Sequence, residues 1–189
     1  MIRDADVLNA LVEMVRRFVR ERLLPAEARV EEENAIPPEI IAEMRALGLF
    51  GMSIPEEHGG LGLTMEEEVL VAFELGYASP AFRSVIGTNN GIGSQGVIVD
   101  GTEAQKQYWL PRMAAGEAIG SFALTEPDVG SDAGAVKTTA RRDGNHYILN
   151  GTKRYITNAP VADVFTVMAR TGGPGPAGVT AFLVPKDSP

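Results

Sequence analysis

The stretch Ser121–Gly134, which reads SFALTEPDVGSDAG, concentrates the polar side chains of this chain that are best suited to chemistry. Hydroxyl and carboxylate groups alternate there with proline and glycine, and a short apolar run, Ile119–Leu124, leads into them. A strand followed by a polar, glycine-containing loop frees backbone N–H and hydroxyl donors for a bound ligand. The same composition also suits an ordinary turn-rich loop, so composition alone leaves a binding loop and a simple connection both open.

Four segments of the chain resemble the acyl-CoA dehydrogenase family of flavoproteins, in the order and spacing of that family. SFALTEPDVGSDAGA is similar to the first family signature, and LNGTKRYITNA, at Leu149–Ala159, is similar to its second flavin-contacting segment. IPEEHGGLGL and GTEAQKQYWLPRMAAGE, which begin at Ile54 and Gly101, fit the family as well. Val129 and Tyr155 depart from the pattern, since they stand where a small residue and a tryptophan are common.

The resemblance implies FAD as the cofactor and places two segments against it. In the first segment, backbone groups and the Thr125 hydroxyl are expected to stabilise negative charge at the N1–C2=O side of the flavin, each donor contributing on the order of 3 kcal/mol. In the second, Thr157 is expected to donate toward flavin N5. Tyr155 is expected to lie against the ring, with plain packing inside the β-domain as its alternative. The cofactor-binding residues that the resemblance implies are Phe122, Ala123, Leu124, Thr125, Gly130, Ser131, Tyr155, Ile156 and Thr157.

The activity that the resemblance implies is α,β-dehydrogenation of an acyl-CoA thioester, in which a carboxylate removes the α-proton while the β-hydride passes to FAD. Ser131 is expected to contact the pantetheine of the acyl-CoA as well as the flavin. The family places the base, a glutamate, in a C-terminal helical domain that residues 1–189 do not include. We therefore expect no catalytic residue in this chain and no turnover by it alone, and we expect Glu126 to be structural.

The resemblance also implies an electron-transfer flavoprotein as the acceptor and a homo-oligomer, a tetramer, as the complete assembly. Two alternatives stay open. One is a non-catalytic flavin- or acyl-CoA-binding or interaction fragment that needs a partner chain. The other is a related acyl-CoA oxidase or nitroalkane oxidase, because these enzymes share the same motifs.

Three further patterns resemble binding or catalytic sites, but a structural role explains each of them better. Gly91–Gly96 matches the G-x-G-x-x-G dinucleotide fingerprint, but no strand precedes it, so we predict a glycine-rich helix, which the resemblance places beside the acyl-chain channel. Residues 66–68 are consecutive glutamates that point in different directions around a helix, so we expect no metal site. His58 lies in a glycine loop without a nearby nucleophile and is expected to have no chemical role.

The net charge of -8 is unevenly distributed, with -9 on residues 1–80 and +1 on residues 81–189. An acidic chain disfavours nucleic acid as a partner, because phosphate binding needs basic clusters. No apolar run approaches the roughly 18 residues of a membrane span, and the N-terminus lacks the apolar core of a signal peptide. The absence of cysteine excludes a disulfide framework and suits a reducing compartment, so we predict a cytoplasmic protein.

Apolar periodicity predicts that residues 1–117 form an all-α domain. A 3–4 spacing over residues 6–24 predicts a helix that ends at Pro25, followed by an acidic linker at residues 31–33. Thr64 with Glu67, and Thr102 with Gln105, form the capping boxes that open two later helices.

After Gly116 the pattern changes to short β-type runs at residues 136–141, 146–150, 153–156, 164–169 and 179–184. The dipeptides Asp143-Gly144 and Asn150-Gly151 are hairpin signals. The predicted fold is therefore α+β, with an all-α domain at residues 1–117 followed by a β-barrel or sandwich domain at residues 118–189. The last predicted strand ends close to Pro189 and leaves an edge to be covered.

Overall fold

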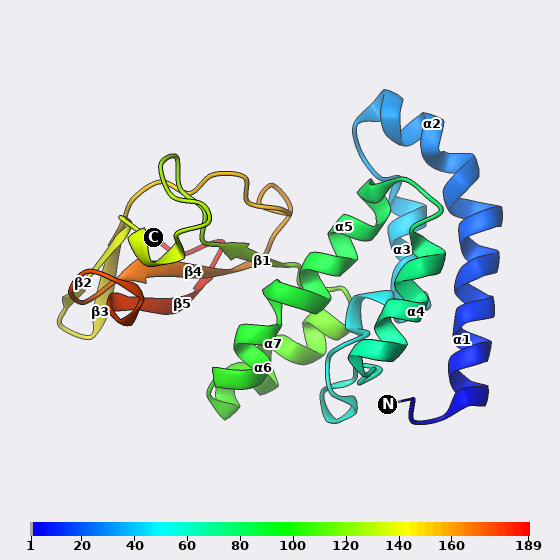
Figure 1. The fold of residues 1–189 in the computed structure, drawn as a ribbon, viewed down its shortest axis with the longest axis horizontal. Coiled ribbons are helices and arrows are strands. Elements are labelled where there is room, and N and C mark those ends of the chain that lie inside the picture. Colours follow the sequence, from blue (N-terminus) through cyan, green and yellow to red (C-terminus); the bar gives the residue numbers. More distant parts are fainter. Residues whose placement is uncertain (1) are drawn as a thin grey trace. The chain divides into compact units, whose positions relative to one another are not determined.

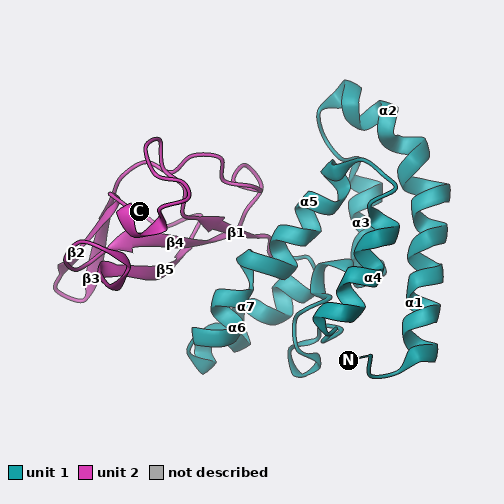
Figure 2. Cartoon of the chain, in the orientation of Figure 1, with its two compact units in different colours: residues 1–117 teal, residues 118–189 magenta. Residues whose placement is uncertain are grey.

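A computed structural model describes residues 2–189, and these divide into two compact units between Glu117 and Ala118 (Figure 2). The first unit is helical, and the second contains a five-stranded mixed sheet (Figure 1). This architecture confirms the predicted α+β fold class. None of the helices in residues 2–189 combines the length and apolar character that crossing a bilayer requires.

The helices of the first unit form where apolar residues recur at helical spacing, as on α1, which buries Leu8, Val15 and Phe18. This helix packs beside α4 (Figure 1). The helices are α1 (Ala5–Phe18), α2 (Leu24–Glu33), α3 (Pro38–Ala46), α4 (Met65–Leu75), α5 (Pro80–Thr88), α6 (Gln95–Asp100) and α7 (Glu103–Ala114), with π-helical turns at Val19–Leu23 and Asn89–Gly93 and 3-10 turns at Leu49–Gly51 and Glu56–His58.

Both predicted capping boxes are present. At the start of α4 the Glu67 amide donates to the Thr64 hydroxyl, and the Glu67 carboxylate accepts the Thr64 amide at 2.8 Å. Thr102 and Gln105 make the same reciprocal pair at the start of α7. These bonds satisfy N–H groups that the first turn of a helix leaves without partners.

The first helix does not end at Pro25, contrary to the prediction. The π-helical turn Val19–Leu23 connects α1 directly to α2, and Pro25, which has no N–H to donate, lies in the first turn of α2 directly after this turn. The acidic residues 31–33 form the last turn of α2 rather than a linker. Arg29 pairs with Glu33 at 2.8 Å across one turn, and Asn34, with φ 50°, ends the helix.

The second π-helical turn, Asn89–Gly93, determines the conformation of the G-x-G-x-x-G sequence at residues 91–96. The amide groups of Asn89 and Asn90 are buried and donate to backbone carbonyls, Asn89 to Phe50 and Met113 at 3.0 Å each. Gly91 departs from helical geometry, with φ -84° and ψ -114°. The sequence therefore forms a kinked helical connection between α5 and α6, in keeping with the predicted glycine-rich helix. It does not form a phosphate-binding loop after a strand.

The sheet of the second unit is mixed, with strand order β1-β4-β2-β3 and with β5 on the remaining edge of β4. β1 and β4 are parallel, whereas β4 and β5 are antiparallel along their full length. The strands are β1 (Gly120–Ala123), β2 (Thr139–Asp143), β3 (His146–Asn150), β4 (Val164–Arg170) and β5 (Val179–Pro185), with 3-10 turns at Ala133–Ala135 and Pro176–Gly178.

The turn at Asp143-Gly144 joins β2 to β3 as a hairpin, which confirms the first hairpin prediction. The second is wrong, because residues 151–158 form a loop and not a strand paired with β3. Backbone geometry explains this outcome, since Tyr155 and Asn158 have φ values of 58° and 67°, which a strand does not accommodate.

Candidate functional site

The strand β1 is followed by an irregular segment, residues 124–131, which we call loop A. A tight turn forms within it, where the Glu126 amide donates to the Val129 carbonyl at 2.9 Å and the Val129 amide returns a bond at 3.2 Å. Val129 is buried, so this departure from the family pattern is accommodated inside the unit. A Cβ built on Gly130 would meet no atom within 4 Å, so a ligand can approach the backbone there.

A second irregular segment, residues 151–158, is called loop B. Its most exposed aromatic side chain is Tyr155, which is 78% exposed, and the Arg154 guanidinium lies 4.5 Å from the centre of the Tyr155 ring. The alternative that Tyr155 packs inside the β-domain is therefore wrong. The left-handed backbone at Tyr155 turns its side chain out of the sheet and leaves an aromatic face available.

Hydrogen bonds from both side chains and backbone fasten this segment to β1 and loop A. The Ser121 hydroxyl donates to the Thr157 carbonyl at 2.6 Å, and the Arg154 amide donates to the Thr125 carbonyl at 2.8 Å. The Lys153 ammonium donates to the Leu124 carbonyl at 2.9 Å. The two segments singled out from the sequence therefore lie against each other, although 29 to 36 residues separate the partners of these three bonds.

A buried ion pair lies under this junction. Lys153 Nζ is 2.9 Å from Glu126 Oε1, and the side chains are 12% and 4% exposed. The carboxylate also accepts the backbone amides of Lys137 and Thr138, at 2.7 and 2.9 Å. Burial by itself raises the pKa of the Glu126 carboxyl, but hydrogen bonds from Thr138, Lys153 and Lys137 outweigh it and lower the pKa to about 2. Glu126 is thus a buried, paired carboxylate that is charged near neutral pH, in keeping with the structural role expected for it.

The exposed polar groups at the junction are hydroxyls. Within residues 2–189, the side-chain oxygens of Thr125, Ser131 and Thr157 have no hydrogen-bond partner, and Ser131 and Thr157 are exposed. The other residues of the predicted cofactor set surround them in loops A and B or at the end of β1. Their exposure differs: Phe122, Leu124 and Ile156 are half-buried, whereas Ala123 is buried.

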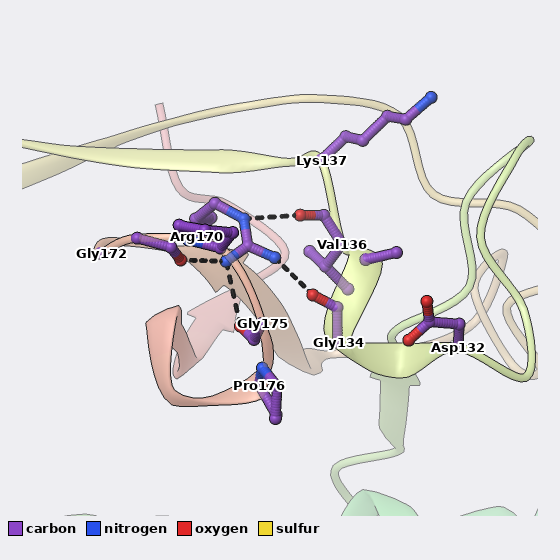
Figure 3. Close-up of a pocket in the computed structure, with 11 residues that line it drawn as sticks. Asp132, Gly134, Val136, Lys137, Arg170, Gly172, Gly175 and Pro176 are labelled. Carbon is purple, nitrogen blue, oxygen red and sulfur yellow. Dashed lines mark hydrogen bonds between the residues drawn. The ribbon is translucent and has the colours of Figure 1, made fainter.

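A hollow of about 730 Å³ lies beyond loop A, between residues 132–137 and the loop that connects β4 to β5 (Figure 3). Arg170, at the end of β4, spans it by donating to four carbonyls, those of Gly134, Val136, Gly173 and Gly175. Figure 3 shows the Lys137 ammonium pointing away from this guanidinium. Sequence reasoning missed both Arg170 and Lys153, because their partners are distant in the chain and no local motif marks them.

The other groups that the sequence brought forward have structural surroundings. Glu67 belongs to the α4 capping box and accepts the Arg3 amide at 2.8 Å. Residues 2–189 contain no cluster of acidic, histidine or cysteine side chains that could hold a metal ion. The His58 imidazole Nε2 lies 3.9 Å from a Glu57 carboxylate oxygen in a 3-10 turn. Glu67 and His58 lie in the first unit.

Comparison with known proteins assigns each unit a counterpart. Residues 6–117 match the family profile described as acyl-CoA dehydrogenase, N-terminal domain, and residues 121–189 match the one described as acyl-CoA dehydrogenase, middle domain. The chain is 37% identical over 177 residues to the acyl-CoA dehydrogenase of Bacillus subtilis, which covers 93% of the chain and 47% of that protein. It is 39% identical over 192 residues to the acryloyl-CoA reductase (NADH) of Anaerotignum propionicum, covering 100% and 48%.

Solved structures give the same result. A glutaryl-CoA dehydrogenase from Mycobacterium smegmatis in complex with FADH2 superposes with a TM-score of 0.87 at 42% identity, covering 98% of this chain and 47% of that one. The chain thus spans about half the length of the curated relatives that it matches.

Proposed function

The chain belongs to the acyl-CoA dehydrogenase family, and we propose that it supplies the flavin-contacting loops of an FAD-dependent enzyme that dehydrogenates an acyl-CoA thioester between its α and β carbons. The observation that carries the proposal is the junction of loops A and B. Hydrogen bonds hold loop B against β1 and loop A while the hydroxyls of Thr125, Ser131 and Thr157 stay unpartnered. Because the chain spans about half of its relatives, the complete reaction is proposed for a longer protein.

The groups at the junction suit a flavin. Bound FAD would supply the ring that accepts a hydride and gains negative charge. Unpartnered hydroxyls on Thr125 and Thr157, together with backbone N–H groups of loop A, are donors that can stabilise such charge without rearrangement. The exposed Tyr155 ring offers an apolar face for stacking, and Gly130 keeps the backbone of loop A accessible.

The proton-abstracting base is proposed to be a carboxylate outside residues 1–189. Glu126, the carboxylate at the junction, is buried, paired with Lys153 and held at a pKa of about 2. A group with so low a pKa has little driving force to take a proton near neutral pH. The residues of loops A and B would therefore bind and orient the cofactor, and Ser131 would also hold the acyl-CoA.

Reduction of an α,β-unsaturated thioester is the second candidate, because the 39% identical relative from Anaerotignum propionicum is an acryloyl-CoA reductase. It is the same chemistry in reverse, and donors that favour charge on the flavin serve both directions. We propose dehydrogenation as the main activity, with an electron-transfer flavoprotein as acceptor and a homotetramer as the complete assembly. An oxidase would instead pass its electrons to oxygen.

Cofactor binding is the first test. Purified residues 1–189 would be titrated with FAD, FMN and NAD and followed by flavin fluorescence and, for NAD, by calorimetry. We expect weak but saturable binding of FAD, and weaker binding of FMN and NAD. Thr157→Ala should weaken the binding of FAD. Failure to bind FAD, or tighter binding of NAD than of FAD, would overturn the proposal.

Turnover is the second test. With FAD, a dye acceptor and acyl-CoA substrates of increasing chain length, residues 1–189 should show no turnover, because the base is missing and a general base commonly contributes about two to four decades of rate. Steady turnover by this chain would contradict our placement of the base. In the longer protein, oxygen consumption would indicate an oxidase. The absence of both acyl-CoA binding and turnover would indicate an interaction fragment.

A further inference from the structure

The Glu126–Lys153 pair connects loops A and B, from which most of the proposed flavin-contacting residues come. Glu126 belongs to loop A and Lys153 to loop B, and their charged atoms are 2.9 Å apart. Glu126 Oε2 accepts the Lys137 amide and Oε1 accepts the Thr138 amide, directly before β2 begins. Through one carboxylate, three stretches of chain are fixed to a common point.

The ammonium group makes a second contact that bears directly on loop A. Lys153 Nζ donates to the Leu124 carbonyl at 2.9 Å, one residue before Thr125. The Arg154 amide, one residue after Lys153, donates to the Thr125 carbonyl at 2.8 Å. The two peptide groups on either side of the Thr125 Cα are thus both held by bonds from loop B. A shift of Lys153 would move the donors on both loops together.

Neither charged group is available to a ligand. The two side chains are 12% and 4% exposed, and their oxygens and nitrogen are already bonded to each other and to the backbone. A buried pair of this kind gives little net stability compared with apolar residues of the same size, but it fixes a defined geometry. An exposed pair, such as that of Lys137 and Asp128, whose side chains are 67% and 74% exposed, contributes little stability and does not fix a geometry.

We infer that Glu126 and Lys153 are positioning residues that set the relative geometry of loops A and B, and thereby the placement of the Thr125 and Thr157 donors around the flavin. This inference rests on the proposed function. Positioning to within about half an ångström is what a binding constellation requires of its supporting residues.

Replacement of Lys153 by a neutral residue of similar length tests the inference. FAD titration of residues 1–189 would compare the unaltered chain, Lys153→Met, the double variant Glu126→Gln/Lys153→Met, and Lys137→Met as the matched control. The dissociation constant and the band shape of bound FAD in the visible region would be recorded at a low temperature where circular dichroism shows each variant folded. We expect the dissociation constant to rise about tenfold for Lys153→Met, with a changed FAD spectrum, and to stay within about twofold for Lys137→Met.

The double variant separates positioning from stability. It removes the unpaired buried charge, so its unfolding midpoint should recover most of the loss seen in Lys153→Met. The bond to the Leu124 carbonyl is still absent, so its dissociation constant for FAD should remain about tenfold raised. Recovery of both the midpoint and the FAD affinity would overturn the inference, as would an unchanged affinity and spectrum in folded Lys153→Met. Absence of FAD binding by the unaltered chain would instead overturn the proposed function, and this inference with it.

Discussion

Glu67 in the helical unit and Glu126 in the sheet unit are buried carboxylates held by the same kinds of contact. Each accepts two backbone amides and faces one cation, Arg3 for Glu67 and Lys153 for Glu126. The pKa of each carboxyl is about 2. Hydrogen bonds from the Arg3 and Thr64 amides are the main cause for Glu67, whereas for Glu126 burial opposes the shift and bonds from Thr138, Lys153 and Lys137 must overcome it.

The two carboxylates differ in the solvent exposure of the cationic side chain that pairs with each of them. The Arg3 side chain is 45% exposed, whereas that of Lys153 is 12% exposed. Water therefore already hydrates the Arg3 guanidinium and screens its pairing with Glu67, so the loss of this pair should cost less than the loss of the pair between Lys153 and Glu126. The first carboxylate completes a helix cap, and the second holds together loops that are distant in the sequence. We therefore expect the two carboxylates to differ in importance for the fold although their pKa values are lowered to the same level.

The largest effect is expected from Lys153→Met. It leaves a buried carboxylate without its cation, which should lower the free energy of unfolding by about 3–5 kcal/mol. Urea unfolding followed by hydrogen exchange with mass spectrometry would localise the loss to residues 118–189. Lys137→Met removes an exposed pair and should change the free energy by less than about 1 kcal/mol. Similar losses for both variants would remove the distinction between a buried and an exposed pair.

Arg3→Met should have a smaller effect than Lys153→Met, because the Arg3 side chain is already 45% exposed and the Arg3 and Thr64 amides still donate to Glu67. The single tryptophan, Trp109, lies in α7, so its fluorescence reports thermal unfolding of the first unit. We expect a modest fall in the unfolding midpoint. A loss as large as that of Lys153→Met would mean that the exposure of the cation does not decide the cost.

Acid should weaken both units in the same pH window. Both carboxyls have folded pKa values lowered from 4.5 to about 2, so each contributes stability above about pH 4.5 that is lost as the pH falls toward about 2. Measured from neutral pH to about pH 2, the free energy of unfolding should fall less steeply in Glu126→Gln for the sheet unit and in Glu67→Gln for the helical unit. Unchanged slopes in both variants would place the acid sensitivity on other groups.

The smallest effect is expected from salt. The Debye length falls from about 10 Å at 0.1 M to about 3 Å at 1 M, which screens exposed charges more than buried ones. Double-mutant cycles at low and high salt should show the Arg3–Glu67 coupling weakening while the Lys153–Glu126 coupling stays nearly constant. Equal salt dependence of the two couplings would contradict the difference in burial.

Local signals in the sequence predicted much of the fold. The capping boxes at Thr64 and Thr102 and the hairpin at Asp143-Gly144 each depend on residues within four positions of one another, so the sequence alone was sufficient. The expectation that Glu126 is structural also agrees with its burial and its pairing. The roles of the cofactor-binding residues remain predictions, now with defined positions in loops A and B.

The errors arose where a distant contact overrides a local preference. Pro25 predicts the end of a helix, yet the helical backbone continues past it into α2 after the π-helical turn Val19–Leu23. Residues 153–156 read as a strand, yet the bonds from Lys153 and Arg154 to residues 124 and 125 hold them as a loop. Neither the turn nor these bonds has a signature within a short window of sequence.

The sequence by itself determined the fold class, the helix caps, the family resemblance and the two segments that bear the candidate site. Only the tertiary structure decided that Lys153, and not a residue of loop A, fixes the Leu124 carbonyl, and that Arg170 spans the neighbouring hollow. The physical reason is range. Propensity, capping and turn chemistry act over a few residues, whereas a buried charge or carbonyl takes whichever partner the packed chain brings within hydrogen-bond distance, here up to 64 residues away.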